Sequence, residues 1–286
     1  MTDVKIVIDN SADMPNELLE KYDIGLVNFL SVFGEKAYVA GVDITNDEFF
    51  DMLESYDGFP TTSQTAYADL YDYFLAQARK HKSVIYFTIS SKASGQYNTM
   101  HLVRDEILEE YPEADIHIVD SEKFSLYIAN AAVCAAKARD EDKSVEEIID
   151  VFKTEIKKWR AYFLVDTLKY LEKGGRVSKT TAFVGNLLDI KPILTIENGL
   201  VESMDKLRGK KKLIEKLIEK IQEDSDFDSE NPEFLVVHSD EEKMEKACNA
   251  LEEEFYEGCV KMVSQVGPII GTHVGKGVIA IIAKIK

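Results

Sequence analysis

The sequence is poor in cysteine, and its few cysteines suggest neither a disulfide framework nor a metal site. The 286 residues include three cysteines, Cys134, Cys248 and Cys259, an odd number at wide spacing. Such cysteines are typical of reduced thiols in a cytoplasmic protein. No cysteine or histidine pair has the spacing of metal ligands, so we expect neither a metal nor a cofactor.

Positive charge and long apolar runs are also scarce. The chain has 52 acidic residues against 34 lysines and arginines, a formal net charge of −18 at pH 7. A charge of this sign disfavours nucleic acid and anionic membrane surfaces as main partners. No apolar stretch approaches the length of a membrane span, and the first residues lack the parts of a secretory signal. We therefore expect a cytoplasmic protein without stable membrane insertion.

The chain does contain enough apolar material for a sizeable core. Hydrophobic residues make up 45% and charged residues 30%, as in an ordinary globular protein. At this length two lobes are expected. Strands alternate with helices over residues 1–158, which predicts a parallel α/β lobe. Residues 159–286 predict an α+β lobe whose sheet is mostly antiparallel.

The elements of the first lobe are predicted from apolar runs and helix-start residues. Residues 84–89 form a β-branched and aromatic run typical of a buried parallel strand. Further strands are expected at 5–9 and 116–119, and helices at 66–80 and 126–138. Asp13, Asn46 or Asp47, and Ser144 are expected to cap three more helices, the last of which runs through Trp159.

In the second lobe, Asn198-Gly199 between two apolar runs predicts a hairpin. Helices are expected at 209–221 and 241–254. Four further strands are expected at residues 234–238, 260–264, 269–274 and 278–282.

Hydroxyl and acidic side chains follow several strands of the predicted parallel sheet. These clusters are Asp9-Asn10-Ser11, Ser90-Ser91 with Ser94, Asp120-Ser121, and, from a turn, Thr61-Thr62-Ser63. Ligands bind beyond the carboxyl ends of parallel strands, where helix N-termini offer free N–H groups. The clusters therefore predict a site for a carboxylate or phosphate. The alternative is that Ser90 or Ser94 merely caps the following helix.

The second lobe offers three features, each with two interpretations. Gly174-Gly175-Arg176 is either a turn that presents a forked cation to an anion or the glycine stop of a helix. The basic run that includes Arg208 and Lys210 is either a solvated helix start or a docking patch for an acidic partner or nucleotide. His273, flanked by glycines, is either structural or an acid–base group.

Together these motifs resemble the DegV family, bacterial fatty-acid-binding proteins whose characterised members act as FakB subunits of fatty acid kinase. The resemblance spans residues 3–283, and its most specific parts are the Gly-Gly-Arg segment and the last two motifs. In chain order the motifs are Asp9-Asn10-Ser11-Ala12-Asp13-Met14-Pro15, Thr62-Ser63-Gln64, Ser90-Ser91-Lys92-Ala93-Ser94-Gly95, Val119-Asp120-Ser121, residues 166–178, Lys191-Pro192-Ile193-Leu194, Leu207-Arg208-Gly209-Lys210-Lys211-Lys212, and Gly267-Pro268 through His273-Val274-Gly275.

The resemblance implies two lobes that enclose one long-chain fatty acid, of the palmitate or oleate class. By position in the motifs, Thr62 and Ser94 would hold the carboxylate. Other groups would lie beside it or face a partner: Ser63, Gly95, Arg176 and His273.

The resemblance also implies a lipid-binding protein that has no catalytic residue of its own. A separate kinase subunit would phosphorylate the bound carboxylate and give an acyl phosphate for phospholipid synthesis, with Arg208 and Lys210 as docking residues. The alternative is an enzyme acting on a small anionic substrate, with Arg176 as the anion clamp and His273 as acid or base.

Several residues depart from the family pattern. Ala93 and Gln96 stand where leucine and threonine are more frequent, Thr65 and Lys276 where proline is usual, and Asn10 replaces a serine. None is an implied carboxylate ligand. The departures instead bear on the preferred acyl chain and on the groups around the carboxylate, and the sequence does not fix the oligomeric state.

Overall fold

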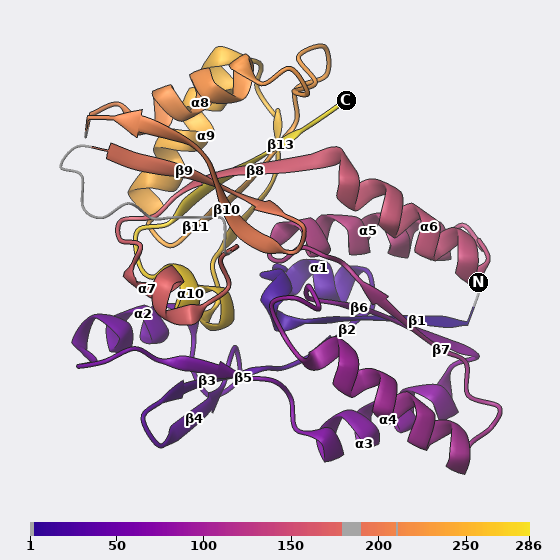
Figure 1. Ribbon diagram of the computed structural model, residues 1–286. Coiled ribbons are helices and arrows are strands. Elements are labelled where there is room, and N and C mark those ends of the chain that lie inside the picture. Colours follow the sequence, from indigo (N-terminus) through magenta and orange to yellow (C-terminus); the bar gives the residue numbers. More distant parts are fainter. Residues whose placement is uncertain (1–2, 179–189, 210) are drawn as a thin grey trace.

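The computed structural model describes residues 3–178, 190–209 and 211–286, which are arranged as two lobes built on three β-sheets (Figure 1). One sheet is parallel, one is mostly antiparallel, and a small third sheet lies beside the parallel one. The predicted α/β class, with a parallel first sheet and a mostly antiparallel second one, is confirmed.

The parallel sheet has the buried strand β6 at its centre. All six residues of β6 are buried, which explains its unbroken apolar run. Helices pack on both faces, α3 and α4 on one and α5 and α6 on the other (Figure 1). In order across the sheet the strands are β2 (Ile24–Val27), β1 (Val4–Asp9), β6 (Ser83–Thr88) and β7 (Ile116–Asp120). The helices of this lobe are α1 (Asn16–Lys21), α3 (Tyr67–Lys80), α4 (Gln96–Glu110), α5 (Leu126–Asp140) and α6 (Val145–Glu155), with short 3-10 turns η1 (Asn10–Ala12) and η2 (Ile156–Lys158).

The small antiparallel sheet connects the first lobe to the second. Its order is β4 (Lys36–Val39), β3 (Leu30–Phe33) and β5 (Thr61–Ser63), and α2 (Asn46–Ser55) follows β4. A side chain at Gly271, on α10 (Pro268–Val274) of the second lobe, would meet the ring of Phe49 on α2 at 2.7 Å. Glycine at that position therefore lets the two helices approach closely.

Within the described residues the second sheet has six strands, and all its neighbouring pairs are antiparallel except β11 and β12. Its order is β10 (Leu200–Arg208), β9 (Ile190–Glu197), β8 (Trp159–Leu164), β13 (Ile279–Lys284), β11 (Phe234–His238) and β12 (Val260–Gln265). Helices α8 (Leu213–Glu223) and α9 (Glu241–Glu254) cover one face, while α7 (Lys169–Gly174) and α10 (Pro268–Val274) lie at the junction of the lobes (Figure 1).

The predicted hairpin is confirmed as β9 and β10, and its tip contacts the first lobe. Asn198 and Gly199 have positive φ values of 49° and 79°, which match the twist of the flanking strands. The Gly199 carbonyl accepts the Ser90 hydroxyl at 2.8 Å, and Lys123 Nζ donates to the Ile196 carbonyl at 2.6 Å. The hairpin thus fastens the second lobe to the loops after β6 and β7.

The largest buried cluster runs through both lobes. It includes Ile6 and Phe87 of the parallel sheet together with Ala161 and Ile282 of the second sheet. The proposed division between residues 158 and 159 coincides with the end of η2 and the start of β8. Because the cluster crosses that point, the lobes share a core.

One predicted strand is wrong. Residues 269–274 belong to helix α10, which begins at Pro268 with Gly267 as its N-cap. A short apolar run alone does not separate a strand from a buried helix, whereas glycine followed by proline is typical of a helix start.

The predicted helix ends need smaller corrections. Thr45, rather than Asn46 or Asp47, caps α2 through a reciprocal pair of bonds with Glu48. Asp13 does not cap α1, whose N-cap is Pro15.

Ser144 caps α6 as predicted, with Glu147 as its partner. The helix ends at Glu155, however, and Trp159 begins β8. The helix predicted at 209–221 begins later, at Leu213.

Candidate functional site

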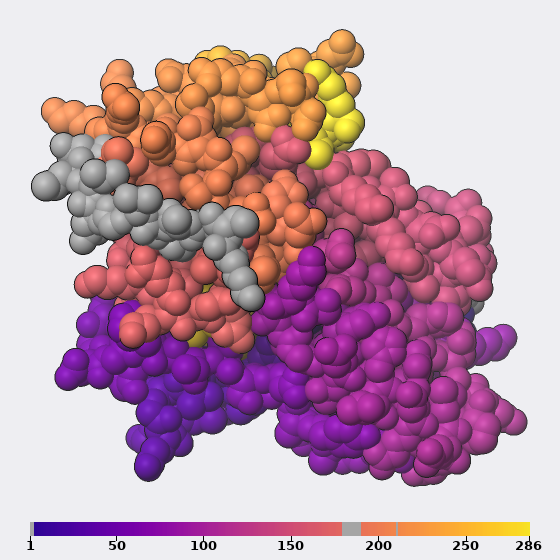
Figure 2. All heavy atoms as spheres, in the orientation of Figure 1, coloured from indigo at the N-terminus to yellow at the C-terminus, as the bar shows by residue number. Residues whose placement is uncertain are grey.

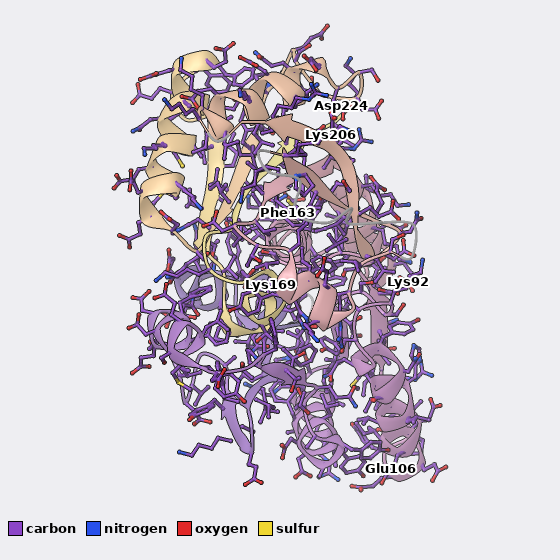
Figure 3. All side chains as sticks on the ribbon, turned by 60° about the vertical axis from the view of Figure 1, so that its left-hand side comes forward. Lys92, Glu106, Phe163, Lys169, Lys206 and Asp224 are labelled. Carbon is purple, nitrogen blue, oxygen red and sulfur yellow. The ribbon has the colours of Figure 1, made fainter. Side chains whose placement is uncertain are left out.

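A cavity of about 170 Å³, partly open to solvent, lies where the two lobes and the small sheet meet. Lys92, on the loop after β6, and Lys169, at the start of α7, lie near this junction between the lobes (Figure 3). In the space-filling view, indigo and purple atoms of the first lobe contact the salmon and orange atoms of the second (Figure 2).

The polar side of the cavity is assembled from four separate elements. Thr62 comes from β5, Ser94 from the loop before α4, Arg176 from the turn after α7, and His273 from α10. Thr62 Oγ1 and His273 Nε2 are 3.2 Å apart, within hydrogen-bond distance. Two residues 211 positions apart in the chain are therefore paired here. We call the part of the cavity around Thr62, Ser94 and His273 the head-group corner.

Arg176 crosses from one lobe to the other. Its Nε donates to the Ala93 carbonyl at 3.0 Å, next to Ser94, and another guanidinium nitrogen donates to the Gly174 carbonyl. Gly175 has a left-handed φ of 67° and ends α7, so the glycine-stop interpretation of this motif is confirmed. The same turn aims Arg176 at the cavity, so both interpretations describe this segment.

His273 is held as a neutral imidazole. Burial lowers its pKa to about 4, and the nearby Arg176 guanidinium contributes in the same direction. Among the described residues, Nδ1 has no hydrogen-bond partner. The ring packs against Gly174, where any side chain would collide with Nδ1.

Ser94 combines a cap-like bond with access to the cavity. Its hydroxyl accepts the Gln96 amide N–H at 3.2 Å, and the side chain is half-buried at the cavity wall. A hydroxyl that accepts through a lone pair still has its proton to donate. The cap alternative and a ligand role for Ser94 are thus compatible.

The remaining walls are apolar. They come from both lobes, so the cavity combines hydrocarbon surface with a few polar groups gathered on one side. The apolar lining residues are Phe29, Ile89, Ala93, Phe124, Leu171, Val201, Ile269, Ile270 and Val274.

Six of the predicted site residues share this one cavity: Thr62, Ser63, Ser94, Gly95, Arg176 and His273. Of the two docking residues, Arg208 is described by the structure and does not line the cavity. Arg208 ends β10, where its carbonyl accepts Lys216 Nζ at 2.7 Å, and Lys210 is outside the described residues. Lys206, on the same strand, lies in the second lobe, well away from Lys92 and Lys169 (Figure 3).

Two of the four hydroxyl and acid clusters hold backbone rather than line the cavity. Asp9 accepts the Ile89 amide at 2.8 Å and the Ser11 hydroxyl. Asp120 accepts the Ser91 amide at 3.1 Å. These carboxylates fix the loop that carries Ser94, so the expectation that all four clusters face a ligand is wrong.

Sequence reasoning missed most of the apolar wall. Phe29 and Phe124 follow strands β2 and β7 and gave no local sign of a ligand role. Gln64, to which the sequence assigns no role beyond its place in a motif, lines the cavity and donates to Thr99 Oγ1 at 2.9 Å.

Two further kinds of feature are absent from the described residues. This part of the chain contains no group of three histidine, cysteine or acidic side chains placed to hold a metal ion. None of its helices is both long and apolar enough to cross a membrane.

The sequence pattern of the DegV family, described as uncharacterised proteins, matches residues 3–286. The chain belongs to the DegV family. A DegV domain-containing protein of Clostridium perfringens is 32% identical over 272 residues, 95% of both chains. One of Clostridium acetobutylicum is 34% identical over 282 residues, covering 97% of this chain and 96% of the relative.

Solved structures of the DegV family have the same fold. A Thermotoga maritima DegV lipid-binding protein is 32% identical with a TM-score of 0.84, covering 100% of this chain and 99% of its own. A second Thermotoga maritima protein, described as revealing a fatty-acid-binding function, is 30% identical with a TM-score of 0.83 over 100% of both chains. Bacillus subtilis DegV, described as a fatty-acid-binding protein, is 29% identical with a TM-score of 0.85 over 100% of both chains.

Proposed function

We propose that this protein binds a long-chain fatty acid in the cavity between its lobes and presents the carboxylate to a kinase partner in the cytoplasm. The observation that carries the proposal is the make-up of the cavity, whose mostly apolar lining includes Thr62 paired with His273 and Arg176 bonded beside Ser94. Membership of a family whose solved relatives are described as binding fatty acids supports it.

The proposed carboxylate ligands are Thr62 and Ser94. A buried carboxylate without hydrogen-bond donors is strongly unfavourable, so its binding needs groups that donate. With the ring proton on Nε2, His273 donates to Thr62 Oγ1 and leaves the threonine proton for the ligand. Ser63, Gly95 and Arg176 line the same cavity.

The proposed driving force is burial of the acyl tail. Each buried methylene contributes about 0.8 kcal/mol, so a long chain gains more from the wall than a short one. The neutral state of His273 also suits a site in which the only full positive charge among the described lining residues is that of Arg176.

The proposed role is that of a carrier without catalysis of its own. Phosphoryl transfer to give the acyl phosphate takes place on the separate kinase subunit, for which Arg208 and Lys210 are the proposed docking residues. Arg208 lies at the end of an edge strand in a chain of net charge −18, so it is suited to an acidic partner surface.

Native mass spectrometry of the purified protein tests the proposal. We expect a co-purified species with the mass of a long-chain fatty acid. Denaturation before the measurement should remove it. A ligand-free protein that also fails to take up added palmitate or oleate would contradict fatty acid binding, and turnover of a small anionic substrate by the protein alone would contradict the carrier role.

A further inference from the structure

The buried carboxyl group of Asp13 has no part in the head-group corner or in the helix cap expected from the sequence. Asp13 follows η1 with a left-handed φ of 50°, and only 7% of the residue is exposed. One carboxylate oxygen accepts the Gly267 amide at 2.8 Å, and the other accepts the Ser125 hydroxyl at 2.5 Å. The Asp13 carbonyl accepts the Ser264 hydroxyl as well.

The two donors to this carboxyl belong to two walls of the cavity. Gly267 is the N-cap of α10, the helix that carries Ile269, Ile270 and His273 to the cavity. Ser125 directly follows the lining residue Phe124. One side chain in the loop after β1 therefore joins a wall of the first lobe to a wall of the second.

Ser125 needs such an attachment because its backbone is strained. Its φ of 57° and ψ of −146° lie in a region that residues other than glycine rarely adopt. Its amide donates to the Ser11 carbonyl at 2.8 Å, and its hydroxyl donates to Asp13. The conformation that places Phe124 in the wall is thus held by the loop that contains Asp13.

Burial of the Asp13 carboxyl group contributes little to the stability of the fold. Burial raises its pKa to about 7, against the lowering effect of its bonds from Ser125 and Gly267. Among the described residues no basic side chain forms an ion pair with it, and a buried carboxyl without a cation stabilises a fold poorly. Its two bonds instead set the relative position of the segments that donate them.

We propose that Asp13 is a positioning residue that holds α10 and the Phe124–Ser125 segment at the separation at which the cavity closes around an acyl chain. This role rests on the proposed fatty acid function, although Asp13 itself is not among the residues that line the cavity. Its loss should shorten the time that the ligand stays bound.

The test measures release of radiolabelled palmitate from the loaded full-length protein after excess unlabelled palmitate is added. We expect Asp13→Ala to raise the dissociation rate roughly tenfold or more, because both bonds are lost. Asp13→Asn should restore a rate within about threefold of the original protein, since its amide oxygen can accept from Gly267 and its NH₂ group can donate to Ser125. Ser125→Ala, which removes one bond, should give an intermediate rate.

The matched control is Leu217→Ala, in the core between α8 and the second sheet, which does not line the cavity. It should lower the melting temperature without accelerating palmitate release. Equal acceleration in this control and in Asp13→Ala would overturn the positioning role, as would unchanged rates in both Asp13→Ala and Ser125→Ala. If Asp13→Ala does not fold, an unchanged rate in Ser125→Ala overturns it. Failure of the original protein to retain palmitate would overturn the proposed function and this role with it.

Discussion

At the scale of single residues, the cavity uses hydroxyls that also have bonds within the protein. Ser94 accepts the Gln96 amide, and Thr62 is paired with the buried imidazole of His273. These bonds fix the rotamers of the two side chains before a ligand arrives, which lowers the entropic cost of binding. The head-group corner is therefore preorganised by residues from both lobes.

Replacing both hydroxyls should weaken binding of the fatty acid carboxylate. Thr62→Ala combined with Ser94→Ala removes two hydrogen bonds to a charged group, worth about 3 kcal/mol together, or roughly a hundredfold in Kd for palmitate. Equilibrium binding by isothermal titration calorimetry measures the change. The matched control is Thr61→Ala with Ser91→Ala, neighbouring hydroxyls that do not line the cavity. Equal palmitate affinity in both double variants would contradict the proposed ligands.

The partly buried imidazole of His273 should make stability depend on pH. Its pKa in the folded protein is about 4, against 6.5 when exposed, so between these values the unfolded chain binds more protons. The free energy of unfolding should therefore fall by roughly 3 kcal/mol from this group as pH drops from about 6.5 to 4.

Asp13, whose pKa is raised to about 7, acts in the opposite direction over much of that range. The effect of His273 is thus seen as the difference between the original protein and His273→Gln in urea titrations at several pH values. Parallel curves across about pH 4 to 7 would show that the imidazole is not buried in its neutral form.

At the scale of elements, short contacts join the β9–β10 hairpin to the loop after β6. Gly199 at the hairpin tip has a φ of 79°, and its carbonyl accepts the Ser90 hydroxyl at 2.8 Å. Val201, two residues further along, lines the cavity and exchanges backbone bonds with Arg176 and Ser178. The hairpin therefore places one cavity wall while it fastens the lobes together.

Gly199→Ala should destabilise the protein by more than backbone strain alone. A Cβ atom there would collide with Ser90 Oγ, whereas a Cβ atom at Gly258, which has a similar φ of 84°, would meet no described heavy atom within 4 Å. Gly258→Ala should thus cost about 1 kcal/mol of unfolding free energy from strain, and Gly199→Ala roughly 2 to 3 kcal/mol. Chemical denaturation of the two variants compares them directly. Equal losses would mean that the tip does not press on Ser90.

At the scale of the whole molecule, the cavity is spatially separate from Arg208, the described docking residue of the basic run. Arg208 does not line the cavity, and the neighbouring residue Lys206 lies in the second lobe at a distance from it (Figure 3). Ligand binding and partner docking should therefore be separable by mutation. The strong negative charge of the chain makes a local basic run the natural contact for an acidic surface.

Reversing this charge should abolish presentation without affecting binding. Arg208→Glu with Lys210→Glu should leave palmitate affinity unchanged but reduce acyl phosphate formation by the kinase subunit roughly tenfold or more, through the loss of attraction and new repulsion. The control is Lys80→Glu with Lys157→Glu, an equal change of charge at exposed positions of the first lobe. Equal acyl phosphate formation in both variants would contradict docking at the basic run.

Local signals in the sequence predicted much of the fold. The buried strand β6, the hairpin at Asn198-Gly199 and the cap at Ser144 were predicted correctly because each depends on residues adjacent in the chain. Helix α10 was assigned as a strand because its apolar run is too short to show a period. The polar residues of the cavity were identified by their order along the chain and by the family resemblance, rather than by any local rule.

The sequence by itself determined the α/β class, the family and the chemical types available to a site. Only the tertiary structure decided which of the residues that carry these groups lie close together. Thr62 and His273 are 211 positions apart, and Asp13 joins Ser125 to Gly267 from two other parts of the chain. Such contacts depend on how the lobes pack around their shared core, and the periodicity of local sequence carries no information about that packing.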